Sequence, residues 1–247
     1  MAETATDRID RTRHFKKGEI KAVIFDLDDT LYPEMDYVRS GFSVIARLIA
    51  RKYDLDSDDC YEGLMQTMQR GISGKNFNIF LEEKKLDYSE GTIVELVREY
   101  RNHIPDISLP DETVKTLVSL KDAGIALGLL TDGYLEAQQH KVESLALERH
   151  FHAIVYTDAI GRKHWKPSTK PFLDIVSMLE VESSSCVYIA DNPDKDFRGA
   201  RECGMLGVQT LQWVQRDADA VPEPYRPNMI IRDITLIPGL FVEGKVE

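Results

Sequence analysis

The chain has 247 residues, of which 43% are hydrophobic and 30% are charged, as is typical of a folded globular protein with a sizeable core. Acidic residues outnumber basic ones by 42 to 31, and the net charge of -11 argues against nucleic acid as the main ligand. The three cysteines are too few and too widely spaced for a disulfide scaffold or a zinc site, and no apolar stretch is long enough for a membrane span. These features together predict a cytoplasmic protein.

Residues 1–19 mix basic and acidic side chains and lack the apolar segment of a secretory signal, so we expect a partly disordered leader. The first predicted strand follows at residues 22–25, a short apolar run that ends in Asp26, Asp28 and Asp29. Residues 35–105 then show helical periodicity only, for example at Val38 and Phe42. We therefore predict a catalytic core from residues 20–34 and 106–247, interrupted by an all-helical insert at 35–105.

Strands and helices alternate after the insert. The predicted helices are residues 111–123, 135–147, 171–179 and 197–203, and the predicted strands are 125–130, 153–156, 186–190, 206–211 and 229–231. Such alternation predicts an α/β fold with right-handed crossovers, that is, a Rossmann-like, doubly wound parallel sheet. Ligands of these sheets bind at the carboxyl ends of the strands, where the acidic residues would converge.

Asp26 and Asp28 lie two positions apart at the end of the first strand. An extended backbone would aim both carboxylates to the same side. One carboxylate would then attack phosphorus while the other protonates the departing oxygen and later activates water. The alternative for these residues is an ordinary acidic turn.

A second acidic strand end follows residues 186–190 and contains Asp191 and Asp196. Carboxylates gathered at one edge of a sheet repel one another, and a hard divalent cation such as Mg²⁺ relieves that repulsion and also binds phosphate oxygens. Asp196 taken alone is nearly as well explained as a helix N-cap. Asp191 is therefore the stronger candidate metal ligand.

Two further residues offer groups that suit a phosphoryl substrate. Thr131 closes the second core strand with a hydroxyl, followed by the backbone amides of a turn. Lys166 precedes Pro167 in a loop, where an ammonium would offset the charge of phosphate and carboxylates. A turn-opening threonine and a surface lysine are the ordinary alternatives, and Lys163 and Lys170 lie close to Lys166 in the sequence.

The order of these four elements resembles the haloacid dehalogenase-like (HAD) superfamily over about residues 20–215: Asp-Leu-Asp-Asp-Thr, then Leu-Thr-Asp-Gly, then Lys-Pro, then the segment with Asp191 and Asp196. The resemblance implies that Asp26 forms an aspartyl-phosphate and that Asp28 is the general acid and base. It also implies that Thr131 orients the nucleophile and the phosphate, and that Lys166 stabilises charge.

The same resemblance implies how the cofactor and the phosphate are bound. Mg²⁺ would be held by the carboxylate of Asp26, the backbone carbonyl of Asp28 and the side chain of Asp191, with Asp196 acting more indirectly. Backbone amides of Leu27 and Asp132 would bind the phosphate beside Thr131 and Lys166. Two positions depart from the family pattern, because Asp29 stands where glycine or asparagine is frequent and Ala190 where glycine is frequent.

The insert after the first motif matches the phosphatase branch of the superfamily that carries a helical cap there. Such caps close over the site and select the substrate, so the resemblance makes certain residues in and beside the insert candidate specificity residues, namely Tyr32, Glu34, Arg39, Arg70 and Lys75. His164 and Trp165 border Lys166, but we expect them to pack and leave them outside the catalytic set.

The sequence favours a phosphohydrolase for a small phosphorylated metabolite and leaves the substrate and the oligomeric state open. A dehalogenase is disfavoured because halide departure needs no general acid, whereas Asp28 supplies one. A phosphomutase shares all four motifs and stays an alternative. A catalytically silent regulatory or binding module is the second alternative, although it would be expected to have lost a reactive residue, and none is lost here.

Overall fold

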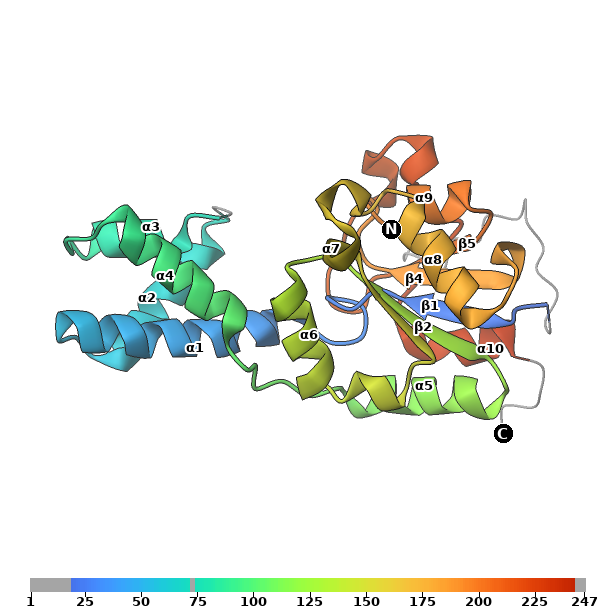
Figure 1. Cartoon of the computed structure of the whole chain (residues 1–247), viewed down its shortest axis with the longest axis horizontal. Helices are drawn as coiled ribbons and strands as arrows, with labels where there is room; N and C mark the ends of the chain where they lie inside the picture. The colour runs from blue at the N-terminus through green and yellow to red at the C-terminus, as the bar shows by residue number, and fades with distance from the viewer. Residues whose placement is uncertain (1–18, 72–73, 243–247) are drawn as a thin grey trace, which may run out of the picture. The chain divides into compact units, whose positions relative to one another are not determined.

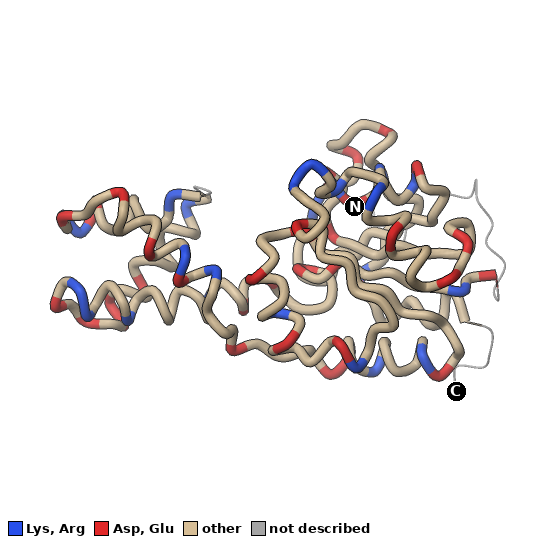
Figure 2. The backbone as a smooth tube through the Cα atoms, viewed as in Figure 1, with Lys and Arg blue, Asp and Glu red and all other residues tan. Residues whose placement is uncertain are grey.

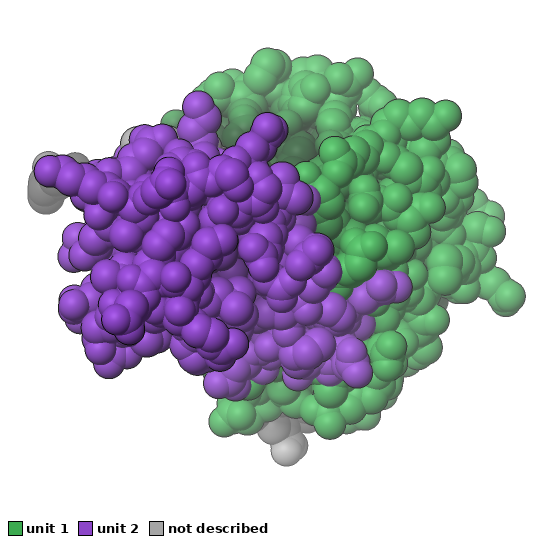
Figure 3. Space-filling model, turned by 60° about the vertical axis from the view of Figure 1, so that its left-hand side comes forward, with its two compact units in different colours: residues 1–33, 108–138, 145–247 green, residues 34–107, 139–144 purple. Residues whose placement is uncertain are grey.

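The computed structural model describes residues 19–71 and 74–242, which form two compact units (Figure 3). One unit is the described part of residues 1–33, 108–138 and 145–247, and the other comprises Glu34–Ile107 and Gln139–Ser144. The predicted leader at residues 1–19 lies outside the described residues, apart from Glu19. Within the described ranges, no helix has the length and apolar character that crossing a membrane requires. Basic and acidic residues are interspersed along both units (Figure 2).

The first unit is built on a sheet of six parallel strands in the order β3-β2-β1-β4-β5-β6. The strands are β1 (Ala22–Phe25), β2 (Ala126–Thr131), β3 (Ala153–Tyr156), β4 (Cys186–Ala190), β5 (Leu206–Thr210) and β6 (Met229–Ile231). The predicted doubly wound, Rossmann-like sheet is thereby confirmed. The strand order reverses between β1 and β4, and this switch point is where sheets of this kind bind ligands.

Helices cover both faces of this sheet. In Figure 1, α8 (Lys170–Leu179) and α9 (Phe197–Glu202) lie on one face, and α5 (Asp111–Asp122) and α10 (Ile237–Phe241) lie on the other. The strands are apolar on both sides because both faces are covered, and β1 and β4 are buried at every position. Shorter elements connect them: α7 (Thr157–Ile160) and the 3₁₀ turns η1 (Leu147–Arg149), η2 (Arg162–His164), η3 (Ser183–Ser185), η4 (Ala218–Ala220), η5 (Glu223–Tyr225) and η6 (Ile234–Leu236).

The predicted core elements occur with small shifts at their ends. α5 ends as expected before Gly124, whose φ of 76° is accessible to glycine at little cost. The helix predicted at 135–147 is α6 (Leu135–Ser144), which stops earlier because Ala146 adopts a left-handed conformation with φ 49°. Asp29, which departs from the family pattern, is also left-handed at φ 52°, a conformation that Asp tolerates better than most residues.

Among the described residues of the second unit, every regular element is a helix. The helices are α1 (Glu34–Tyr53), α2 (Ser57–Gln69), α3 (Asn76–Glu83) and α4 (Glu90–Asn102), which enclose a core that includes Phe42, Ile45, Leu64 and Phe80. This unit also includes Gln139–Ser144, the second part of α6, which we had assigned to the core. One long-range contact within this unit is that of the Lys141 ammonium, which lies 4.2 Å from the ring centre of Tyr37 on α1.

Candidate active site

The first acidic residue after β1 lies beside a buried lysine. The backbone N–H of Asp26 donates to the carbonyl of Ile189 on β4 (2.8 Å), which holds the end of β1 against its neighbour. The Asp26 carboxylate is buried, and its Oδ1 lies 2.9 Å from Nζ of Lys166. Lys166 comes from the loop between η2 and α8, so the tertiary fold joins the first and third motifs.

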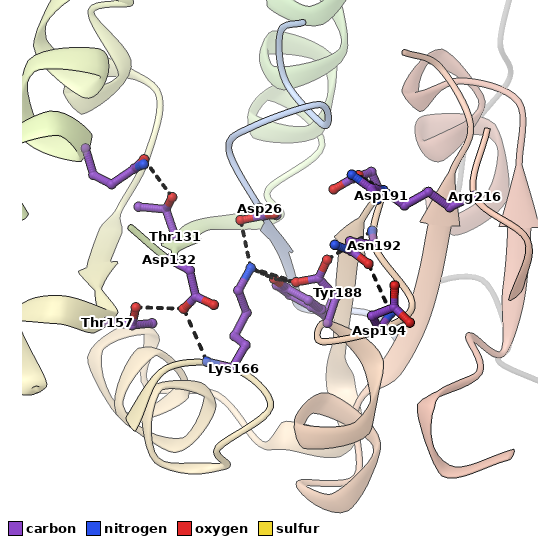
Figure 4. Close-up of polar contacts among 12 residues, drawn as sticks. Asp26, Thr131, Asp132, Thr157, Lys166, Tyr188, Asp191, Asn192, Asp194 and Arg216 are labelled. Carbon is purple, nitrogen blue, oxygen red and sulfur yellow. Dashed lines mark hydrogen bonds and ion pairs between the residues drawn. The ribbon is translucent and has the colours of Figure 1, made fainter. Parts of the chain in front are cut away.

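Three protein groups surround the Lys166 ammonium (Figure 4). Nζ lies 2.9 Å from Oδ1 of Asp26 and 2.6 Å from Oδ1 of Asp196, and it donates to the hydroxyl of Tyr188 at 3.0 Å. An ammonium has three N–H donors, and these three partners account for all of them. Burial by itself lowers the pKa of Lys166, but Asp196 and Asp26 together raise it well above its ordinary value. Lys166 is therefore a fixed positive charge beside Asp26.

The sequence predicts Asp196 as either a helix N-cap or a supporting residue of a metal site. It does occupy the N-cap position of α9, but its side chain makes no capping hydrogen bond. Instead, Oδ1 contacts Lys166 and Oδ2 accepts the backbone N–H of Asn192 at 3.1 Å. The side chain is fully buried, so the structure gives it the task of holding Lys166 and the loop after β4.

Three carboxylates gather at the ends of β1 and β4. Among the described residues, Asp26, Asp191 and Asp196 each offer a carboxylate oxygen within 4.8 Å of the others, and all three are buried. Burial raises the pKa of Asp26, against the opposite effect of Lys166. Burial, together with Asp26 and Asp196, raises the pKa of Asp191 to about 7. Three buried carboxylates carry more negative charge than the one buried ammonium of Lys166 offsets, and carboxylate oxygens are the hard ligands that Mg²⁺ prefers, so this donor set suits the cation that the sequence predicts.

Asp28 lies apart from that carboxylate group, in a turn. β1 ends at Phe25, and the carbonyl of Leu27 accepts the backbone N–H groups of Thr30 and Leu31, so Asp28 lies beyond the strand, within a turn that an isolated bridge between Asp28 and Tyr32 closes. Its Oδ1 accepts the hydroxyl of Tyr32 (2.7 Å), and its Oδ2 accepts Nε2 of Gln138 (3.2 Å). The tight turn, rather than strand alternation, sets the direction of this carboxylate.

Gln138 also links Asp28 to the second motif. The hydroxyl of Thr131, at the end of β2, donates to Oε1 of Gln138 at 2.9 Å, while the amide nitrogen of the same glutamine reaches Asp28. The next residue, Asp132, accepts the hydroxyl of Thr157 (2.7 Å) and the backbone N–H of Lys166 (3.2 Å). The Asp132 side chain thus connects the loop that carries Lys166 to the end of β2 (Figure 4).

The remaining sequence candidates lie elsewhere. Lys170 is exposed and pairs with Asp174 on α8, which leaves Lys166 as the buried lysine of the third motif. Trp165 donates through Nε1 to Asp158 (3.2 Å) and meets the ring of Tyr134 edge-on, so it packs, as expected. Of the specificity candidates, Tyr32 contacts Asp28, and the others belong to the helical unit: Glu34, Arg39 (paired with Asp36), Arg70 (paired with Glu83) and Lys75.

The described residues that contact the site include several that the sequence did not predict, among them Gln138, Tyr188 and Arg216. Tyr188 carried a weak signal, since it places a hydroxyl in the middle of the apolar run 186–190. Gln138 lies in the first turn and a half of α6, and nothing local distinguishes it from a solvated helix residue. Arg216 follows β5 by several residues in an irregular loop, and its partner Asp191 is distant in the sequence.

Comparisons with known families, proteins and structures all point to the same family. The family model described as haloacid dehalogenase-like hydrolase matches residues 23–209. A glyceraldehyde 3-phosphate phosphatase of Methanopyrus kandleri is 29% identical over 206 residues, which cover 81% of this chain and 88% of that protein. An N-acylneuraminate-9-phosphatase of Rattus norvegicus is 23% identical over 241 residues, 90% of this chain and 94% of its own. The crystal structure of a HAD phosphatase from Thermococcus onnurineus is similar with a TM-score of 0.58 at 25% identity, covering 89% of this chain and 97% of that one.

Proposed function

The chain belongs to the haloacid dehalogenase-like hydrolase family, and we propose that it is a magnesium-dependent phosphatase that uses Asp26 to accept the phosphoryl group of a small phosphomonoester. The observation that carries this proposal is the buried contact of Lys166 with Asp26, within a group of three carboxylates at the switch point of the sheet. Relatives whose names specify phosphatases of small phosphorylated metabolites support the same reaction class.

In the first half of the reaction, a carboxylate oxygen of Asp26 attacks phosphorus and forms the aspartyl-phosphate, while the bond from phosphorus to the ester oxygen breaks. Asp28, in its protonated form, gives its proton to that departing oxygen. Its contacts with Tyr32 and Gln138 hold the carboxyl group in one orientation, and they stabilise the ionised carboxylate that remains once the proton has been given up.

In the second half, the Asp28 carboxylate takes a proton from water, and the water oxygen attacks phosphorus. The bond between Asp26 and phosphorus then breaks, which releases inorganic phosphate and restores both carboxyl groups. Lys166 stabilises the negative charge that builds up on the phosphoryl oxygens, since its ammonium is fixed and shielded from water. Thr131 and the backbone amides of Leu27 and Asp132 would bind those oxygens.

Mg²⁺ would be held by the side chains of Asp26 and Asp191 and the backbone carbonyl of Asp28, with Asp196 in support through Lys166. When bound, it neutralises carboxylate and phosphate charge together. We also propose that the helical unit (residues 34–107 and 139–144) influences which phosphomonoester is accepted, with Glu34, Arg39, Arg70 and Lys75 as candidates.

The decisive experiment measures hydrolysis of an aryl phosphate with Mg²⁺, with EDTA, and for the variants Asp26→Asn and Asp28→Asn. We expect activity to require Mg²⁺ and to be lost in both variants. Asp58→Asn on α2 is the matched control, because Asp58 is an exposed aspartate of the helical unit. Activity that survives in Asp26→Asn would refute the mechanism. A panel of phosphomonoesters, with bisphosphate-primed mutase conditions alongside, would separate hydrolysis from phosphoryl transfer between sugar hydroxyls.

A further inference from the structure

An arginine that lies outside the four motifs contacts Asp191, a carboxylate of the fourth motif. Arg216 lies in the loop that follows β5, and its Nε donates to Oδ2 of Asp191 at 2.9 Å. Figure 4 shows the guanidinium beside Asp191 on the side of the site away from Lys166. The Asp191 side chain is 5% exposed, whereas that of Arg216 is 38% exposed, so the arginine approaches the buried carboxylate from the solvent side.

The loop that carries Arg216 is fastened to Asp191 by a second residue. Gln209 is fully buried on β5, directly opposite Ala190 of β4 in the register of the two strands. Its Nε2 donates to the backbone carbonyl of Asp191 (3.1 Å) and to the backbone carbonyl of Arg216 (2.9 Å). One amide group therefore ties together the backbones of the metal-ligand candidate and the arginine. The ion pair is thus built into the fold and does not depend on a long surface side chain alone.

The contact has a chemical consequence for the carboxylate. The hydrogen bond from the guanidinium engages Oδ2 and restricts rotation of the carboxylate, which leaves Oδ1 without this contact. An arginine stays charged at all physiological pH values, so this restraint is permanent. Outer groups of this kind orient the side chains that bind a metal.

We propose that Arg216 is a positioning residue that holds Asp191 as a one-oxygen ligand and thereby raises the affinity of the site for Mg²⁺. The inference rests on the metal site of the proposed function. Arg216 has two opposing effects on Mg²⁺ binding: it orients the Asp191 carboxylate, and its positive charge repels the cation. Because Gln209 holds the backbone of Arg216 beside that of Asp191, the guanidinium orders the carboxylate before a metal binds, and we expect this ordering to outweigh the repulsion.

The test measures Mg²⁺ binding to the full-length, metal-stripped protein by calorimetry for the wild type, Arg216→Gln and Arg216→Lys. We expect the Kd for Mg²⁺ to rise roughly tenfold or more in Arg216→Gln, within the range found when such outer partners of metal ligands are removed. Arg216→Lys retains the charge but lacks the planar group, and we expect an intermediate Kd. Arg98→Gln on α4 is the control, because Arg98 is an exposed arginine that pairs with Glu99.

A second measurement uses aryl phosphate hydrolysis as Mg²⁺ is increased. If Arg216 acts by positioning, excess Mg²⁺ restores kcat in Arg216→Gln and leaves KM for the ester unchanged. An unchanged Kd in Arg216→Gln would overturn this inference and leave the phosphatase intact, and tighter binding would show that charge repulsion dominates and overturn it equally. Absence of Mg²⁺ binding in the wild type would overturn both this inference and the metal part of the proposed function.

Discussion

Replacement of Tyr188 by Phe removes one hydroxyl from the centre of the site. That hydroxyl accepts a hydrogen bond from Lys166 at 3.0 Å and donates to Oδ1 of Asp196 at 3.3 Å. The aromatic ring is retained, and with it the edge-on contact with Phe172, whose ring centre lies 4.9 Å away. The change therefore leaves the packing of β4 in place and removes polar contacts alone.

The expected decrease in thermal stability follows from the charge and the hydrogen bonds of Lys166. Asp26 and Asp196 still raise its pKa in the variant, so the ammonium stays charged and loses one of three hydrogen-bond acceptors. A hydrogen bond to a charged group contributes about 1.5–3 kcal/mol, and the longer bond to Asp196 adds less. Each kcal/mol lowers the Tm of a protein of this size by roughly 2–4 °C, so we expect a decrease of roughly 3–12 °C.

Thermal unfolding followed by circular dichroism would measure this decrease. Tyr53→Phe is the matched control, since it removes an exposed hydrogen bond to the carbonyl of Asp87 in the helical unit, and we expect a smaller change. An unchanged Tm in Tyr188→Phe would refute the view that Tyr188 is the third partner of Lys166. A decrease no larger than that of the control would refute it equally.

Three further outcomes are expected. Burial, Asp26 and Asp196 raise the pKa of Asp191 to about 7, so its carboxyl group is protonated below that pH and ionised above it. Calorimetry should therefore show tighter Mg²⁺ binding as the pH rises from about 6 to about 8, and a Kd that stays constant would contradict this. Gly133→Ala should lower kcat, because Gly133 has a φ of 140° that alanine rarely adopts and because the new Cβ would displace the side-chain amide of Gln138. Wild-type kinetics in this variant would show that the contacts of Gln138 with Thr131 and Asp28 are dispensable. Gly63→Ala should destabilise the helical unit by about 1–3 kcal/mol, because its Cβ meets the ring of Phe80, and an unchanged denaturant midpoint would argue against that packing.

The sequence determined the architecture and the position of the site. Parallel strands place their carboxyl ends at one edge of a sheet, so the acidic ends of the runs at 22–25 and 186–190 had to lie together once the alternation of strands and helices was recognised. The buried pairing of Asp26 with Lys166 agrees with the order of the motifs. Local periodicity carries this information because each strand and helix is specified by its own residues.

The tertiary structure alone decided which residues contact and orient the side chains of the candidate site. Gln138 reaches Asp28 across 110 positions, Arg216 reaches Asp191 across 25, and Lys166 reaches Tyr188 across 22. It also decided that Asp196 holds Lys166 rather than capping α9, and that Asp28 points from a turn rather than from a strand. A single polar residue has no periodic signature, and its partner is chosen by the packing of elements far apart in the chain. The candidate reactive residues could therefore be predicted from the sequence, whereas the residues that contact and orient them became apparent only in the folded protein.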